Sequence, residues 1–199
     1  MTSARRRSRA VAAWGGGLLL LVLASLLLRA VPSDADSERP FVVTAAVGEA
    51  ATARTFTVTV TDAGLADTLR AGDWEQPGNW LVVDLSVEGA GSDATSYLGR
   101  AAFVLGTGAG VGPGAESGRR EYRASERFLS LVNGPLVTGV PQTGSIAFEL
   151  PAGAAGQGAI EFAQHGDTRL DSLVSVALDL DELQRVPERE VRETGWGSE

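Results

Sequence analysis

Acyl transfer by a serine nucleophile needs a histidine as general base, and the sequence contains a single histidine, His165. Asp167 follows two residues later, but the chain has no G-x-S-x-G motif that would expose a nucleophilic serine. The segment 165–167, His-Gly-Asp, is instead typical of a turn between two strands. The chain also contains no cysteine, which excludes thiol catalysis, thiolate metal ligands and disulfide bonds. We therefore predict an exposed turn histidine and no catalytic residue.

Carboxylates gather in two places where a cation could be held. The two groups are Asp62, Asp67 and Asp73, and Asp179, Asp181 and Glu182. Neither group has the spacing and the fixed glycine of an EF-hand loop, so we predict no resident metal ion and no cofactor. Adventitious calcium at a loop stays open as an alternative, as does a carboxylate pair that hydrolyses glycosides.

A glycine-rich stretch runs from Gly106 to Gly118 and reads GTGAGVGPGAESG. A dinucleotide-binding G-x-G-x-x-G motif would need glycine where Val111 or Pro113 stands, and no Gly-Lys-Ser/Thr follows. We therefore expect a surface hairpin loop that binds no nucleotide.

Charge is distributed unevenly along the chain. Five of the 17 basic residues lie at or before position 29, whereas all 25 acidic residues lie after position 33. The later part thus carries 12 positive and 25 negative charges, a net charge of −13. Nucleic-acid binding needs a basic surface, so this balance predicts no nucleic-acid partner. The negative sign also disfavours electrostatic docking of this part on anionic lipid.

The segment Ala10–Leu28 determines the location of the acidic part of the chain relative to a membrane. Its 19 residues carry no charge, and eight of them are leucines. A helix of this length reaches about 28 Å, close to the ~30 Å hydrocarbon core of a bilayer. Four arginines precede the segment and Arg29 follows it, which predicts a cytoplasmic stub at 1–9 and a transmembrane helix at 10–29. The lipid bilayer is then a partner through Ala10–Leu28. A cleaved signal peptide remains the alternative, and both interpretations export the rest of the chain.

Alternation with a period of two predicts the strands that follow. In Thr55–Thr61, threonine alternates with three apolar residues, Phe56, Val58 and Val60, which is typical of a half-buried strand. Asn79–Gly89 alternates in the same way, and its opening Trp80 is expected in the core. The other predicted strands are Phe41–Val47, Tyr97–Leu105, Gly144–Pro151, Ala159–Gln164 and Leu173–Leu180.

The connections between these strands are less regular. Asp62–Gly78 is predicted as a long connection, with either a short helix or an edge strand at Leu65–Leu69. Arg119–Arg127 is charged and predicted to be exposed, with an edge strand as one option. Gly144–Pro151 and Ala159–Gln164 flank a Gly/Ala-rich turn, so they are predicted to pair as a hairpin.

Seven or eight short strands, with Gly/Pro turns and no amphipathic helices between them, predict an all-β fold. The expected architecture is an immunoglobulin-like antiparallel β-sandwich, preceded by a single N-terminal transmembrane helix. We place a linker at 30–40 and the β-sandwich at 41–180. The charged residues 181–199 are predicted to form a disordered or loosely docked tail.

The order of motifs resembles a family of uncharacterised immunoglobulin-like domains in Gram-positive, notably actinobacterial, exported or membrane-anchored proteins. The resemblance lies in Thr57–Thr61, Gly78–Val87, Phe103–Gly106 and Gly144–Gly153, and it extends from about Phe41 to Leu180. This family is similar in fold to a small secreted mycobacterial antigen. The resemblance implies a β-sandwich in an extracytoplasmic setting, and it supplies no catalytic residues.

These observations predict a single-pass, membrane-anchored extracytoplasmic module that binds another protein of the cell envelope and is not an enzyme. Two alternatives remain. One is an envelope hydrolase that uses a carboxylate pair, and the other is an ectodomain that senses a small ligand or an ion.

Overall fold

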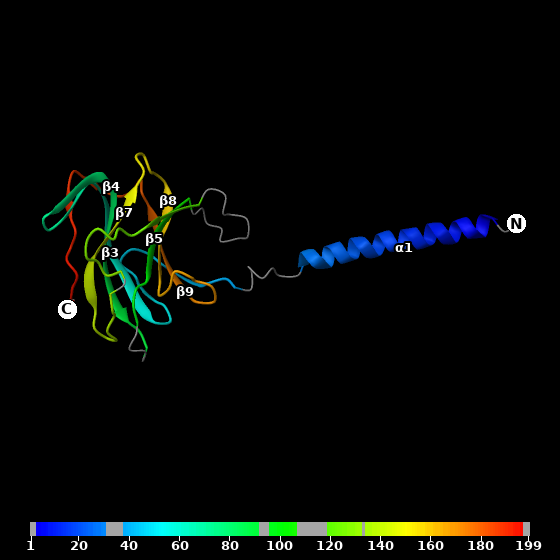
Figure 1. Cartoon of the computed structure of the whole chain (residues 1–199), viewed down its shortest axis with the longest axis horizontal. Helices are drawn as coiled ribbons and strands as arrows, with labels where there is room; N and C mark the ends of the chain where they lie inside the picture. Colours follow the sequence, from blue (N-terminus) through cyan, green and yellow to red (C-terminus); the bar gives the residue numbers. More distant parts are fainter. Residues whose placement is uncertain (1–2, 31–37, 92–95, 107–118, 133, 197–199) are drawn as a thin grey trace. The chain divides into compact units, whose positions relative to one another are not determined.

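The computed structural model describes residues 3–30, 38–91, 96–106, 119–132 and 134–196 (Figure 1). The chain divides into two compact units, Met1–Glu38 and Arg39–Glu199. The predicted glycine-rich loop at Gly106–Gly118 lies outside the described residues except for Gly106.

The first unit contains one helix, α1, at Ser3–Ala30. It begins within the predicted stub at 1–9, because no helix-breaking residue separates the arginines from the apolar run. The described side chains of α1, at positions 14–27, are exposed. Among the residues that the structure describes, no helix is both long and apolar enough to cross a membrane. The helix is therefore confirmed, whereas its transmembrane character is not supported by the structure.

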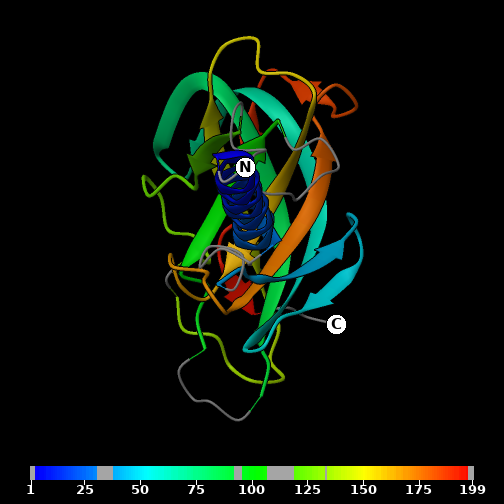
Figure 2. The same cartoon turned by 90° about the vertical axis from the view of Figure 1, so that its right-hand side faces the viewer.

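The second unit is a β-sandwich of two sheets (Figures 1 and 2). The five-stranded sheet has the order β1-β9-β8-β5-β6, and the seven-stranded sheet has the order β10-β3-β4-β7-β12, with β2 and β11 also paired to β3. The first sheet contains β1 (Phe41–Ala45), β5 (Arg100–Leu105), β6 (Arg120–Arg123), β8 (Gln157–Ala163) and β9 (Ser172–Asp179). The second contains β2 (Ala50–Thr52), β3 (Phe56–Ala71), β4 (Trp74–Gly89), β7 (Gln142–Leu150), β10 (Arg185–Val186), β11 (Arg189–Glu190) and β12 (Gly195–Trp196).

The β-sandwich is thus confirmed, and its pairing is antiparallel except at three outer strands. β1 runs parallel to β9, and β10 and β11 run parallel to β3. Antiparallel hairpins join strands that are adjacent in sequence, whereas parallel pairs need a connection that crosses the molecule. Here β10 and β11 reach β3 only after the chain has passed through both sheets.

The predicted alternation of apolar and polar residues correctly identifies the side chains that form the core. Phe56, Val58 and Val60 are buried, as are the apolar residues of β4, β7, β8 and β9 that were expected to face inward. They meet between the two sheets in one hydrophobic cluster. Complete burial of a large apolar side chain stabilises the fold by about 1.5–3 kcal/mol relative to exposure, so this cluster holds the sheets together.

The prediction of a long connection at Asp62–Gly78 is wrong, because β3 and β4 continue through it as one long hairpin. The pairing between them shifts register at Val60/Asp62 and again at Ala66/Thr68. A bulge interrupts the alternation of side chains, which hides a continuous strand from a search for period two. Gly72, with a φ of 59°, closes the turn between them.

The predicted hairpin of Gly144–Pro151 with Ala159–Gln164 is also wrong. β7 pairs with β4, whereas β8 pairs with β5 and β9 in the other sheet. The intervening turn, in which Gly153 and Gly156 have positive φ, therefore carries the chain from one layer to the other.

The prediction of a loosely docked tail is wrong as well, since residues 185–196 form three short strands against the seven-stranded sheet. Val191 is buried there in a second cluster with Trp80 and Leu69. Trp80 is thus buried, but on the outer side of β4 and not between the sheets. Figure 1 shows this tail in red on the side of the sandwich away from β8 and β9.

Candidate functional site

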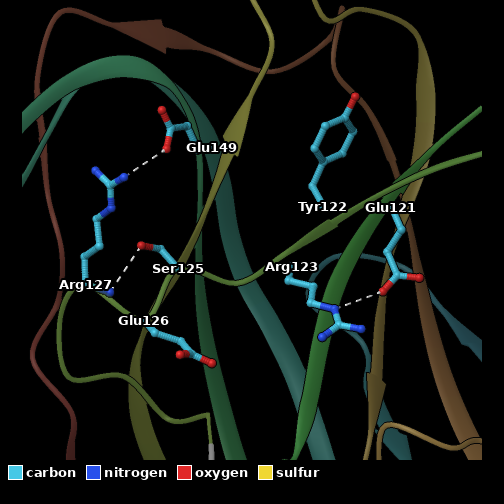
Figure 3. Close-up of a pocket in the computed structure, with 7 residues that line it drawn as sticks. All are labelled: Glu121, Tyr122, Arg123, Ser125, Glu126, Arg127 and Glu149. Atoms are coloured by element: carbon cyan, nitrogen blue, oxygen red, sulfur yellow. Dashed lines mark hydrogen bonds and ion pairs between the residues drawn. The ribbon is translucent and has the colours of Figure 1, made fainter.

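A surface pocket of about 480 Å³ lies beside strand β6 (Figure 3). It is lined by Glu121, Tyr122, Arg123, Ser125, Glu126, Arg127 and Glu149. All but one of these residues come from a single stretch of chain, 121–127, and Glu149 comes from β7. The pocket therefore lies where the edge of one sheet approaches the other.

Strand β6 is the last strand of the five-stranded sheet and pairs only with β5. Tyr122 faces the core and stacks on Phe103, with ring centroids 6.5 Å apart. Because side chains alternate along a strand, Glu121 and Arg123 point to the outer face of the sheet. The sequence RREYR thus anchors the strand with one aromatic residue and leaves its charged residues in solvent.

The hydrogen-bond pattern shows which backbone groups of β6 are open. The Ala124 N–H donates to the Ala101 carbonyl at 3.1 Å. In an antiparallel pair only every second residue bonds to a given neighbour, so Tyr122 bonds to β5 while Glu121 and Arg123 do not. The N–H and C=O groups of Glu121 and Arg123 therefore point away from β5, toward the pocket edge. No backbone partner for them is found among the described residues.

After β6 the chain crosses between the sheets. The Ser125 N–H donates to the Ala147 carbonyl of β7 at 2.8 Å. This bond holds the segment 124–127 against β7 and brings Arg127 within 3.9 Å of the Glu149 carboxylate. Figure 3 shows these two side chains on one side of the pocket and Glu121 with Arg123 on the other.

The pocket contains charges of both signs. Arg123 lies 3.7 Å from Glu121 and is 85% exposed, so its guanidinium is largely available to another molecule. Glu126 has no hydrogen-bond or ion-pair partner in the described part of the chain. Open carboxylates and guanidinium groups beside free backbone groups suit the binding of a polar, extended segment.

A partly buried ion-pair network supports the pocket from the outer face of the sheet. Arg100 of β5 donates to Glu121 at 3.0 Å and to Glu161 of β8 at 3.3 Å, and Arg119 also contacts Glu161. Burial alone would lower the pKa of Arg100, but its hydrogen bonds to the two glutamates raise that pKa above its usual value. Glu161 is 8% exposed at its side chain, so the network ties β5, β6 and β8 together.

The same network determines the protonation of Glu121. The hydrogen bond from Arg100 lowers the pKa of this carboxyl below its usual value, and burial opposes the shift. A glycosidase acid needs a raised pKa so that it carries a proton at neutral pH. Glu121 is ionised under those conditions and can accept hydrogen bonds but not supply a proton.

His165 lies in the turn between β8 and β9, as predicted. Its Nδ1 is 2.6 Å from the Tyr97 hydroxyl, and the two rings meet edge to face. Asp167 does not orient this imidazole, because its carboxylate accepts hydrogen bonds from Arg169. Those bonds lower the pKa of Asp167 to about 2. The structure therefore brings His165 to a tyrosine and not to an aspartate.

Three of the six carboxylates in the two predicted groups are engaged in other contacts. Asp62 and Asp67 accept hydrogen bonds from Arg189 and Arg185 of the tail, each at 2.7 Å. Asp179 accepts a hydrogen bond from the Asp181 N–H within its own turn. No group of three or more metal-ligating side chains is found in the ranges that the structure describes.

The pocket was missed in the sequence because it depends on sheet order. The stretch RREYRASER shows only that its residues are charged and that an edge strand is one option. That β6 is the outermost strand, and that Glu149 lies opposite, follows from pairing between distant segments. The one local signal is the run of charged residues on both sides of Tyr122, which is typical of an edge strand.

Comparisons with known proteins add little to this geometry. No protein-family model matches the chain, and no curated protein matches it. Among solved structures, the chain is similar to an uncharacterised β-sandwich protein from Clostridium difficile 630, with 7% identity and a TM-score of 0.42. The match covers 73% of this chain and 99% of the other.

Proposed function

We propose that this chain is a membrane-anchored, extracytoplasmic interaction module of the cell envelope. The observation that carries the proposal is the open edge of β6, where four backbone groups and a charged pocket face solvent together. Extended segments of partner proteins commonly add to such an edge, because backbone hydrogen bonds supply affinity and neighbouring side chains supply specificity.

An immunoglobulin-like topology is part of this proposal. Strands β3, β4 and β7 are neighbours in one sheet, and β6, β5, β8 and β9 are neighbours in the other. This order of neighbours supports the proposal, because an immunoglobulin domain has strands A-B-E in one sheet and C′-C-F-G in the other. In that comparison β6 corresponds to C′, a strand that variable-type domains add at the edge of the sheet.

The proposed anchor rests on the apolar run Ala10–Leu28 and the arginines before it. It is tested by fractionating cells that produce the chain with a C-terminal tag. We expect a full-length product in the membrane fraction that external protease removes. A shortened product in the medium would mean that the run is a cleaved signal, and a soluble intracellular product would refute export.

The interaction itself is tested by cross-linking in those cells, followed by purification of the tagged full-length chain. Arg123→Pro is the informative variant, because the Arg123 N–H points away from β5 and its loss leaves the β5–β6 pairing intact. We expect cross-linked species to be lost in this variant and retained in Glu193→Gln, an exposed change in the tail. Equal cross-linking in both variants would show that the β6 edge is not the binding surface.

A further inference from the structure

We propose that the partner at the β6 edge is a second copy of this chain, paired antiparallel with the first through β6. The two five-stranded sheets would then join into one continuous sheet across a two-fold axis. This inference deepens the proposed function and rests on it for the use of the β6 edge, but it requires neither the anchor nor export.

The register of β6 permits this pairing. Glu121 and Arg123 are the two residues of β6 whose backbone groups are open. An antiparallel pair of identical strands centred on Tyr122 places Glu121 opposite Arg123 of the other copy, and Arg123 opposite its Glu121. Residues that exchange both hydrogen bonds must both face the partner strand, and this register satisfies that condition at both positions.

The charges of Glu121 and Arg123 also favour this pairing. Both side chains lie on the outer face of the sheet, so the register sets a carboxylate against a guanidinium twice across the axis. Opposite charges on directly paired residues stabilise a sheet, whereas like charges destabilise it. Charged residues on an edge usually discourage pairing between chains. The sequence Glu-Tyr-Arg is different because it complements itself when it is read in the opposite direction.

Both side chains are also accessible to a second chain. Arg123 is 85% exposed and lies 3.7 Å from its own Glu121, so its guanidinium is free to turn toward another chain. Glu121 is already held by Arg100 in a fixed position, with 37% of its side chain exposed. The carboxylate is therefore ordered before association, which lowers the entropy lost on binding. Tyr122 would lie on the axis next to its symmetry mate.

A strand of four residues offers a small contact, so we expect a reversible dimer that depends on concentration. The measurement is sedimentation equilibrium of the full-length chain in detergent micelles, over at least a hundredfold range of concentration. Arg123→Glu sets glutamate against glutamate at both pairs, and Glu121→Arg sets arginine against arginine. Each variant alone should weaken the dimer at least tenfold.

An equimolar mixture of the two variants provides the decisive comparison. In a mixed dimer, each glutamate of one chain meets an arginine of the other, so association should return to within about threefold of the wild type. A wild-type chain that stays monomeric throughout the concentration range would overturn the inference. A dimer that neither variant weakens would overturn it too.

A cysteine reporter tests the register without a charge change, because the natural chain has no cysteine. Residues that pair across the axis without hydrogen bonds have Cα atoms about 4.5 Å apart, within reach of a disulfide. Tyr122→Cys should therefore form a covalent dimer under mild oxidation. Ala177→Cys, exposed on the interior strand β9 of the same sheet, should remain monomeric. Equal cross-linking of both variants would refute the register.

These outcomes separate the inference from the proposed function. If the purified chain does not self-associate, but cells still yield a cross-linked species that Arg123→Pro removes, the β6 edge binds a different protein. The proposed interaction module then stands, and the second copy is excluded as its partner.

Discussion

Asp84 is a charged residue that the fold buries on the outer face of β4, with 7% of its surface exposed. Its carboxylate accepts hydrogen bonds from the Ser145 hydroxyl at 2.5 Å and from Arg189 at 3.0 Å. Arg192 lies 3.5 Å away from the same carboxylate. A buried charge is tolerated only when it is paired, so this residue links the sheet to the tail that covers it.

Replacing Asp84 with alanine should lower the free energy of unfolding by about 3–5 kcal/mol, because it leaves Arg189 without its buried partner. Asp62→Ala removes the other carboxylate of Arg189, but Asp62 is 63% exposed. An exposed ion pair contributes at most about 1 kcal/mol, so this control should be nearly neutral. Urea unfolding followed by circular dichroism measures both changes. Equal losses of stability in the two variants would show that burial does not make the Asp84 ion pair more important than the exposed Asp62 pair.

At the residue scale we also expect Glu121 to make the stability of the fold depend on pH. Its pKa in the folded chain lies below the usual 4.5, chiefly because of the hydrogen bond from Arg100. The ionised carboxylate therefore stabilises the fold fully above pH 4.5, and this contribution is lost as the pH falls through the lower, folded pKa. Glu121→Gln should be less stable than wild type at pH 7, and the difference should shrink below pH 4.5.

Thermal unfolding of both proteins at a series of pH values measures this difference. The matched control is Glu126→Gln in the same pocket, because Glu126 has no ion-pair partner among the described residues. Its stability should track that of the wild type at every pH. If the difference in stability between Glu121→Gln and the wild type stayed constant down to pH 2, the stabilising role of the ionised Glu121 carboxylate would be contradicted.

At the scale of elements, the tail residues 185–192 complete the outer layer of the seven-stranded sheet. Val191 is 6% exposed and packs in the cluster of Trp80, Leu69 and Ala147. The Val191 N–H also donates to the Arg70 carbonyl at 2.7 Å, which fixes the side chain in place. The tail therefore acts as a structural layer.

Val191→Asp should detach this layer, because a carboxylate without a partner would be buried against Trp80. We expect the loss of about 2 kcal/mol or more of stability and a shift of tryptophan emission to longer wavelength as Trp80 meets water. Glu193→Gln, an exposed change two residues away, should alter neither quantity. Fluorescence and urea unfolding on the same samples give both readings. An unchanged emission spectrum would mean that the tail is not what covers Trp80.

On the scale of the whole molecule, the sequence predicted the layers better than their connections. Strict alternation at Thr55–Thr61 and Leu173–Leu180 was sufficient to identify strands and their buried faces, because a half-buried strand imposes period two. The bulges in β3 interrupted that signal, so its second half was assigned to a connection. Strands of two residues, such as β10 and β11, are too short to show any period.

The candidate site was the least predictable part for a related reason. Charged residues at 119–127 could be recognised, but their role depends on which strand ends the sheet. Sheet order is decided by burial over the whole core and not by the local sequence. The wrong prediction of a hairpin between β7 and β8 has the same origin. Their proximity in sequence favoured direct pairing, whereas the two strands belong to different sheets.

The position of the tail at the end of the chain also determines the order in which the layers of the fold can form during synthesis. Synthesis runs from the N-terminus, so β1 to β9 are complete before residues 185–192 leave the ribosome. Until then the cluster around Trp80 lacks Val191, and Asp84 has neither of its arginines, Arg189 and Arg192. The sandwich can assemble its inner core during synthesis, but its outer layer closes only after translation has passed position 192. A nascent chain stalled before that point therefore presents a hydrophobic, negatively charged surface to chaperones that the finished protein does not have.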